Sequence, residues 1–245
     1  MRPSDEEPAM HEYRIEDDGI AHVRLDDGKA NVLNEATCAA LRGGIDAAAE
    51  AGAGALVIHG RDGMFSGGID LSLVRNPDAQ ARGAGLQTVA HTLLAVWTAP
   101  IPTVAAVTGH AIAGGAILAM ACDVRIGTAG SFKIGINETR LKMVFPTWAL
   151  VIAQAGIRPS AWNETILRGD LVDPDGGVRT GILDEAVAPE AHAARVAEIA
   201  AGLAEIPTRA YGGNKALLRR AEAERAGALV AAEMGAGFAS DQIGQ

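Results

Sequence analysis

The chain has few of the residues that mark disulfide-rich, nucleic-acid-binding or membrane-spanning proteins. Its 245 residues include only two cysteines, Cys38 and Cys122, and both lie in apolar segments, which is typical of reduced thiols in a protein core. Aromatic residues make up 4% of the chain, the net charge is −9 and no basic run occurs, so nucleic acid is not an expected partner. The longest apolar run, residues 111–122, is too short to span a bilayer, so no membrane is expected either.

Two further absences narrow the possible functions. Histidine and cysteine spacings that hold metal ions do not occur, so no metal site is expected. Residues 1–10 are acidic and lack the basic-then-apolar order of a signal peptide. They predict a flexible tail and, together with the reduced cysteines, a cytoplasmic location. A small anionic ligand remains compatible with the net charge, because a few cations and helix amino termini suffice to bind it.

The order of apolar and turn-forming segments predicts an α/β fold. Continuous apolar segments at 55–58 and 103–107, separated by helical sequence, are typical of strands buried on both faces of a sheet. Asp18-Gly19 lies between two alternating segments and predicts a hairpin. The other predicted elements are strands at 124–126 and 132–134 and helices from Asn34 to about residue 50, at 79–97 and up to Cys122.

The last quarter of the chain changes character. From Pro189 onward the sequence is helical apart from breaks expected at Pro207 and Gly212-Gly213. We therefore predict two regions, a core over residues 1–188 and a C-terminal helical region over residues 189–245.

Two glycine-containing turns make the most specific chemical prediction. Phe65-Ser66-Gly67-Gly68-Ile69-Asp70 follows the apolar strand 55–58, and Ala113-Gly114-Gly115 follows the strand 103–107. Each segment predicts a turn that opens a helix, where backbone N–H groups are unpaired and carry partial positive charge. Glycine lets a ligand come close to that backbone. Two such turns in one pocket would stabilise an oxyanion, although glycine pairs also serve close packing of a helix on a strand.

Other motifs that contain glycine or serine do not fit. Neither glycine cluster has the spacing of a dinucleotide-binding loop, and no G-K-[ST] phosphate loop occurs. Ser66 is not in a G-x-S-x-G nucleophile elbow, because Met64 occupies the position of the first glycine.

Glu138 is the nearest candidate for a base that would generate the anion. Apolar neighbours such as Ile136 and Val144 predict a partly desolvated carboxyl group with a raised pKa. The alternative is a surface carboxylate paired with one of three nearby cations, Lys133, Arg140 or Lys142.

The ordered set of motifs resembles the crotonase family, also called the enoyl-CoA hydratase/isomerase superfamily. The segments that carry the resemblance are 29–34, 65–70, 108–123, 136–148 and 181–187. The resemblance implies a crotonase-type spiral of repeated β-β-α units with a C-terminal helical region, assembled as a homotrimer or a dimer of trimers. It also implies an acyl-CoA thioester substrate, with coenzyme A as part of the substrate and no separate cofactor.

Site residues follow from the resemblance position by position. It implies that the backbone N–H groups of Ile69 and Gly114 form an oxyanion hole. The implied substrate-binding and CoA-binding residues are Lys29, Ala30, Ser66, Gly67, Gly68, Asp70 and Asn137. A solvated surface position is the alternative for Lys29, and helix capping is the alternative for Asp70.

One departure from the family pattern favours a particular reaction. Hydratases of this family carry two glutamates, but here the first position is Ile117 and only the second, Glu138, is retained. The segment Asn137-Glu138-Thr139-Arg140-Leu141, with Pro146 eight positions after the glutamate, resembles the Δ3,Δ2-enoyl-CoA isomerase branch. The resemblance therefore favours a one-base shift of a double bond from 3-enoyl-CoA to 2-enoyl-CoA. Alternatives are a hydratase, another crotonase-type reaction such as thioester hydrolysis or decarboxylation, and a catalytically silent acyl-CoA-binding or assembly protein.

Overall fold

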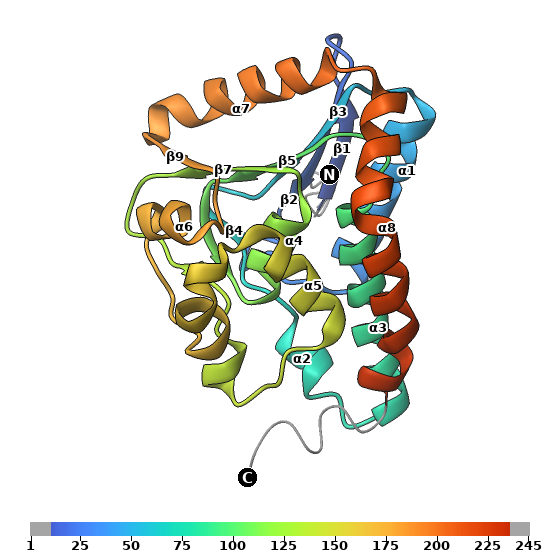
Figure 1. Ribbon diagram of the computed structural model, residues 1–245, viewed down its shortest axis with the longest axis vertical. Helices are drawn as coiled ribbons and strands as arrows, with labels where there is room; N and C mark the ends of the chain where they lie inside the picture. The colour runs from blue at the N-terminus through green and yellow to red at the C-terminus, as the bar shows by residue number, and fades with distance from the viewer. Residues whose placement is uncertain (1–10, 236–245) are drawn as a thin grey trace, which may run out of the picture.

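The computed structural model describes residues 11–235, which form two β-sheets surrounded by helices (Figure 1). The larger sheet has the strand order β1-β2-β3-β5-β7-β9. Its strands are β1 (His11–Ile15), β2 (Ile20–Leu25), β3 (Ala55–His59), β5 (Thr103–Val107), β7 (Val124–Thr128) and β9 (Glu185–Val187). Only the β1–β2 pair is antiparallel. The hairpin predicted at Asp18-Gly19 is confirmed, with the Ile20 N–H donating to Asp18 Oδ1 at 2.9 Å.

A smaller sheet carries the turns of interest. It contains β4 (Gly63–Ser66), β6 (Gly109–Ile112) and β8 (Ile134–Gly135), in that order and all parallel. The strand predicted at 132–134 is displaced, because the Lys133 N–H donates to the His110 Nδ1 atom rather than to a strand partner.

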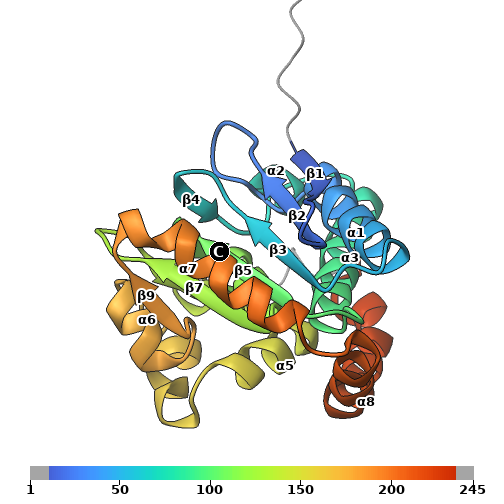
Figure 2. The ribbon, with the colours of Figure 1, turned by 90° about the horizontal axis from the view of Figure 1, so that it is seen from above.

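Helices cover both faces of the larger sheet. The α-helices of residues 11–235 are α1 (Glu35–Glu50), α2 (Leu71–Val74), α3 (Ala79–Trp97), α4 (Gly114–Ala121), α5 (Thr147–Gly156), α6 (Pro174–Thr180), α7 (Pro189–Ala204) and α8 (Thr208–Glu233). Figure 2 shows α7 lying across one face of this sheet, where it buries residues such as Val57 and Val104. The predicted boundary at residue 188 falls between β9 and α7, and the division into two regions stays a prediction.

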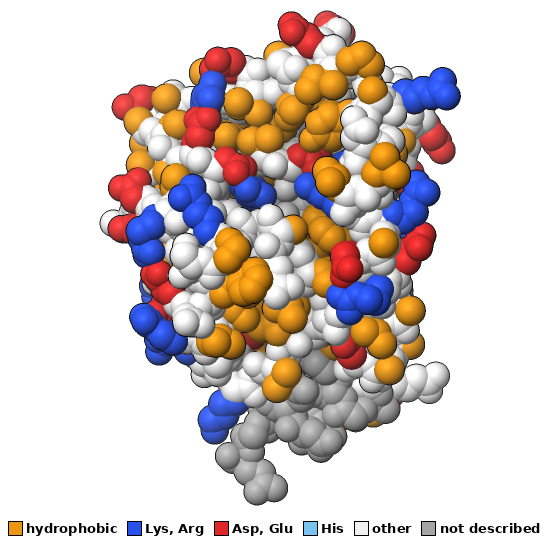
Figure 3. All heavy atoms as spheres, viewed as in Figure 1, with side chains coloured by type: hydrophobic (Ala, Val, Ile, Leu, Met, Phe, Trp, Pro, Cys, Tyr) orange, Lys and Arg blue, Asp and Glu red, His pale blue; other side chains and the backbone are white. Residues whose placement is uncertain are grey.

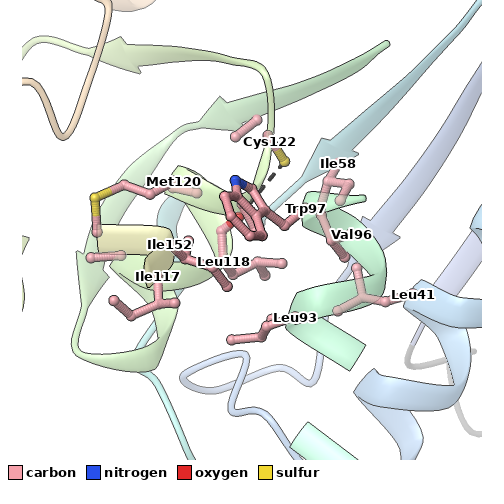
Figure 4. Close-up of a cluster of buried hydrophobic side chains, with 14 of the residues drawn as sticks. Leu41, Ile58, Leu93, Val96, Trp97, Ile117, Leu118, Met120, Cys122 and Ile152 are labelled. Carbon is pink, nitrogen blue, oxygen red and sulfur yellow. Dashed lines mark hydrogen bonds between the residues drawn. The ribbon is translucent and has the colours of Figure 1, made fainter. Parts of the chain in front are cut away.

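The main hydrophobic core lies on the opposite face, between the sheet and helices α1, α3, α4 and α5. Figure 4 shows side chains from all these elements meeting around Trp97, which is 4% exposed. Cys122 lies in this cluster, where its thiol approaches the Leu118 carbonyl oxygen at 3.7 Å. Both cysteines are buried and free, as the sequence predicted.

Helix α8 corrects one prediction. The helix runs without interruption through Gly212-Gly213, although these glycines were expected to break it. A Cβ on Gly212 would stand 2.3 Å from the Pro100 carbonyl oxygen, so glycine here permits close packing of the helix. The predicted break at Pro207 is correct, because Pro207 immediately precedes α8. The predicted tail over residues 1–10 and the end of the C-terminal region, residues 236–245, lie outside the described residues.

Candidate active site

Three turns meet at one edge of the small sheet. The strands β4, β6 and β8 are parallel and adjacent, so their carboxyl ends, Ser66, Ile112 and Gly135, lie at the same edge. Neighbouring strands are about 4.8 Å apart, which places the outer two strands within about 10 Å of each other. The turns that follow are residues 67–69, 113–114 and 136–138. Topology alone therefore gathers both predicted oxyanion donors and Glu138 at one edge, as is common for ligand sites on parallel sheets.

The first turn presents the N–H of Ile69. The Gly67 N–H donates to the Ala30 carbonyl oxygen at 2.8 Å, and the Gly68 carbonyl oxygen accepts from the Leu33 N–H at 2.8 Å. The next residue, Asp70, donates its N–H to the Leu33 carbonyl oxygen. Within residues 11–235, the N–H of Ile69 between them donates to no acceptor. The flanking hydrogen bonds thus fix the turn and leave one amide available.

The second turn presents the N–H of Gly114 through an unusual backbone conformation. Ala113 has φ 53° and ψ −128°, a region that favours glycine and costs an alanine about 1–3 kcal/mol. Its N–H donates to the Gly135 carbonyl oxygen at 2.8 Å, and its carbonyl oxygen accepts from Ala116 and Ile117 at the start of α4. The N–H of Gly114 has no acceptor in the described part of the chain. It stands at the positive end of α4.

The two turns lie directly against each other. A Cβ placed on Gly68 would stand 3.0 Å from the amide nitrogen of Gly114. A Cβ placed on Gly114 would stand 3.4 Å from the amide nitrogen of Ile69. Two free donors that are this close can bind one oxygen atom and stabilise negative charge on it.

Glu138 supplies a half-buried carboxyl group on the third turn. It begins a 3-10 helix, Glu138–Leu141, and its Oε2 atom is buried without a hydrogen-bond partner in the described residues. Burial raises the pKa of Glu138 to about 7, although the backbone amides of Glu138 and Asn137 oppose the shift. None of the ion pairs found within residues 11–235 includes Glu138, and Arg140 pairs with Asp170 instead. These observations support the prediction of a desolvated Glu138 carboxyl group over the alternative of a surface carboxylate paired with a nearby cation.

Ile117 offers no polar group at this edge. It lies one turn after Gly114 in α4, is 0% exposed, and belongs to the apolar cluster of Figure 4. Glu138 is therefore not accompanied by a second carboxylate from this position.

The predicted ligand-binding residues take different positions. Lys29 is exposed, and Ala30 holds the first turn through its carbonyl oxygen. Asp70 caps α2, with its Oδ1 accepting from the Ser72 N–H at 2.8 Å. Asn137 has a buried Oδ1 without a hydrogen-bond partner among the described residues. Ser66 is 0% exposed and its hydroxyl accepts from the Gly68 N–H at 3.2 Å, so it supports the turn and a direct ligand contact is not supported.

Sequence reasoning missed two contributors to the site. The positive φ of Ala113 has no signal in the sequence, because alanine does not ordinarily mark such a conformation. Thr139 and its contact with Ile166 were also missed, although Thr139 is part of the Asn137–Leu141 segment that the resemblance singled out.

Residues 11–235 contain neither a metal-binding cluster nor a membrane-spanning helix. No group of three or more His, Cys, Asp and Glu side chains there is arranged to hold a metal ion. No helix in that range combines the length and the apolar character needed to cross a membrane.

Comparison with known proteins agrees with this arrangement. The model of the enoyl-CoA hydratase/isomerase family matches residues 16–236. Human mitochondrial enoyl-CoA delta isomerase 1 is 31% identical over 176 residues, which are 70% of this chain and 57% of that protein. Peroxisomal enoyl-CoA delta isomerase 1 of Arabidopsis thaliana is 34% identical over 126 residues, or 50% of this chain and 51% of that protein. The chain thus spans only between a half and three fifths of the length of these two relatives.

A solved structure shows the same fold over nearly the whole chain. The crystal structure of a probable enoyl-CoA hydratase from Mycobacterium tuberculosis superposes with a TM-score of 0.86 and 32% identity. The superposition covers 95% of this chain and 98% of that one. The predicted crotonase-type α/β fold is confirmed, and this chain belongs to the enoyl-CoA hydratase/isomerase family.

Proposed function

We propose that this chain shifts the double bond of a 3-enoyl-CoA thioester to the 2-position, with Glu138 as the only catalytic base. Two relatives named as enoyl-CoA delta isomerases support this reaction. The observation that carries the proposal is the carboxyl group of Glu138, whose Oε2 atom is buried without a hydrogen-bond partner in the described residues, with isoleucine instead of glutamate at position 117.

The backbone donors act on the thioester carbonyl. The N–H groups of Ile69 and Gly114 hydrogen-bond its oxygen, which gains negative charge when a proton leaves C2. Glu138 accepts the C2 proton, and the electron pair of that C–H bond enters a dienolate. Glu138 then returns the proton to C4, where a new C–H bond forms and the double bond moves to C2–C3. One carboxyl group suffices for both steps, and its pKa of about 7 suits it to accept and to donate a proton near neutral pH.

The remaining predicted residues bind the rest of the substrate in this proposal. The turn Gly67-Gly68 lies beside the thioester, and Lys29, Ala30 and Asp70 lie along the path of the CoA moiety. Asn137 offers a buried acceptor to a donor group of the ligand. Ser66 acts indirectly by holding the turn.

The proposal includes a homotrimer, or a dimer of trimers, in the cytoplasm. Exposed leucines on α8 support a contact between copies, because Leu217 is 86% exposed and Leu218 is 82% exposed. The buried free cysteines are compatible with a reducing compartment.

Substitution of the base tests the reaction. Glu138→Gln is expected to lower the kcat for a 3-enoyl-CoA by about 1,000-fold or more, because the amide cannot accept the proton. Glu16→Gln is the matched control, since Glu16 is an exposed residue paired with Arg14 at 2.8 Å. Isomerisation is followed with 3-enoyl-CoA and hydration with 2-enoyl-CoA in separate assays. Full isomerase activity in Glu138→Gln would exclude Glu138 as the base.

Hydration is the second candidate function. One relative in the comparison is named a probable enoyl-CoA hydratase. The unsatisfied Oδ1 of Asn137, next to Glu138 in the chain, is a second polar group that can orient a water molecule. A wild-type enzyme that hydrates 2-enoyl-CoA faster than it isomerises 3-enoyl-CoA would favour this candidate. Calorimetric binding of a CoA thioester without turnover of either substrate would indicate a silent acyl-CoA-binding protein.

A further inference from the structure

The segment that carries Glu138 is fastened to a π-helix. The 3-10 helix Glu138–Leu141 lies against the π-helix Asn163–Leu167, and the Thr139 hydroxyl donates to the Ile166 carbonyl oxygen at 2.9 Å. These residues are far apart in sequence, so the contact determines where the 3-10 helix lies relative to the rest of the fold.

The π-helix leaves the Ile166 carbonyl oxygen available to accept the hydrogen bond from the Thr139 hydroxyl. The Gly169 N–H donates to Thr165 and the Asp170 N–H donates to Glu164, so neither N–H reaches Ile166. π-helical turns are rare in proteins, and those that occur are often found at functional sites. Here the irregular turn supplies an acceptor for the residue that follows Glu138.

A second contact lies beside the first. Arg140 Nε donates to the Gly169 carbonyl oxygen at 3.0 Å, and the Arg140 guanidinium pairs with Asp170, which also pairs with Arg168. Gly169 has φ 63°, and a Cβ on it would stand 3.3 Å from the Asn137 Cα. The backbone just before Glu138 therefore packs directly on this turn.

The π-helix is itself held firmly. The Thr165 hydroxyl donates to the Ala161 carbonyl oxygen at 2.8 Å, and both Thr165 and Ile166 are buried. Glu164 accepts two hydrogen bonds from Arg179 of α6, at 2.8 Å and 2.6 Å. Lys and Arg side chains follow the edge of the molecule near α6 in Figure 3, and Arg140 and Arg168 are 60% and 67% exposed. Because exposed ion pairs contribute little, the backbone carbonyls of the π-helix region provide the main attachment.

We propose that Thr139 and Arg140 are positioning residues, which fix Glu138 by hydrogen-bonding the backbone carbonyls of Ile166 and Gly169. This inference rests on the proposed function of Glu138 as the catalytic base. The motif Asn137–Leu141 thereby gains a physical role beyond its glutamate. The charged groups around the 3-10 helix, Arg140, Arg168 and Asp170, pair with one another rather than with Glu138. Burial is the main cause of the raised pKa of Glu138, and the two hydrogen-bonded attachments keep the carboxyl group in this position.

Replacement of the hydroxyl group by a methyl group tests the role of Thr139. Thr139→Val is expected to lower kcat for 3-enoyl-CoA by about 10-fold with little change in KM, because the base is misplaced while CoA binding remains. The acid limb of the kcat/KM profile is expected to move to lower pH, because a loosened segment admits water to the carboxyl group. Thr139→Ser keeps the hydroxyl group, and it is expected to have the wild-type kcat and the wild-type acid limb of the kcat/KM profile. The control is Thr88→Val, which removes a similar hydroxyl–carbonyl bond, to Ala84, on the exposed side of α3.

The outcomes separate this inference from the proposed function. A Thr139→Val enzyme with unchanged kcat, or with reduced activity and an unmoved acid limb, would overturn the positioning role. If Glu138→Gln keeps full isomerase activity, the proposed function fails. If Glu138→Gln abolishes the reaction while Thr139→Val changes nothing, only the positioning role fails. Should Thr139→Val not fold, as judged by circular dichroism, Arg140→Gln takes its place with the same expected shift and the same overturning result.

Discussion

Gly114 packs directly against Ile69. A Cβ on Gly114 would stand 3.2 Å from the Ile69 Cγ1 atom and 3.4 Å from its amide nitrogen. The first turn follows β4 and the second follows β6, so adjacent parallel strands bring these residues together. The pair forms a donor site because one residue has no side chain and the other contributes only its backbone.

Gly114→Ala tests this donor site. The added methyl group would stand 3.4 Å from the Ile69 amide nitrogen and crowd that donor, so kcat/KM for 3-enoyl-CoA is expected to fall about 100-fold, comparable to the loss of one oxyanion donor. The nearest atom is the terminal Cδ1 of Leu33 at 3.1 Å, which can shift by a few tenths of an ångström, so Tm is expected to change little.

Gly43→Ala is the matched control for that substitution. Gly43 lies in α1, and a Cβ there would meet nothing within 4 Å. This variant is expected to keep full activity and to gain about 1 kcal/mol in the free energy of unfolding. Wild-type kcat/KM in Gly114→Ala would argue against a shared oxyanion site.

The pH dependence of the rate follows from Glu138. Its carboxyl group must be ionised to accept the C2 proton, and burial raises its pKa to about 7. Hence kcat/KM is expected to be constant above this pH and to fall about tenfold per pH unit below it. The measurement is kcat/KM for 3-enoyl-CoA from pH 5 to pH 9, with circular dichroism showing that the protein stays folded. A rate that remains constant down to pH 5 would contradict a desolvated base.

Much of the fold was predictable because its signals are local. The Asp18-Gly19 hairpin and the apolar strands β3 and β5 follow from turn chemistry and from runs of apolar residues. The resemblance of the motifs identified the family, and the two glycine turns indicated where the backbone is exposed to a ligand.

Other features depend on contacts between distant residues. Gly212-Gly213 satisfies the local rule for a helix break, but the close approach to Pro100 explains why glycine occurs within a continuous helix. The strained conformation of Ala113 is imposed by its neighbours in the β6–β8 ladder and by α4. The Thr139–Ile166 contact requires a π-helix, for which the sequence has no established signal.

A buried ionic cluster is expected to secure α8. Asp123 Oδ2 lies 2.7 Å from Lys215 Nζ, its Oδ1 lies 2.7 Å from Arg219 Nη1, and these Asp123 and Lys215 side chains are 6% and 5% exposed. The Asp123 carboxylate also accepts from the Thr103 N–H. Asp123→Ala would leave Lys215 buried without its counterion, so we expect a loss of about 3–5 kcal/mol in the free energy of unfolding.

Urea denaturation measures this loss. The control is Glu16→Ala, because Glu16 and Arg14 are 43% and 56% exposed where they pair. We expect less than about 1 kcal/mol for this surface pair. Equal losses in the two variants would show that burial does not strengthen the Asp123 cluster. Activity per folded molecule is expected to be unchanged in both, because neither residue touches the turns at the small sheet.

Finally, Glu138 is expected to lower the stability of the folded protein as pH rises from about 4.5 to about 7. Its pKa is raised from 4.5 to about 7, so the folded state retains a proton that the unfolded state has lost between these values. The free energy of unfolding therefore falls as pH rises through this window, by about 3 kcal/mol in total. Glu138→Gln does not titrate and is expected to be more stable than the wild type by up to that amount at pH 8.

Comparison of two pH values isolates this effect from other consequences of the substitution. At pH 5 the folded-state carboxyl group is protonated, and the gain from Glu138→Gln is expected to be less than about 1 kcal/mol. Denaturant unfolding of both proteins at pH 5 and pH 8 gives the four free energies, and Glu16→Gln serves as the exposed control. An equal gain at both pH values would mean that the carboxylate is solvated when ionised, and the case for Glu138 as a base with a raised pKa would fail. A gain confined to pH 8, together with loss of isomerase activity, would mean that the same desolvation destabilises the fold and makes the carboxylate a stronger base.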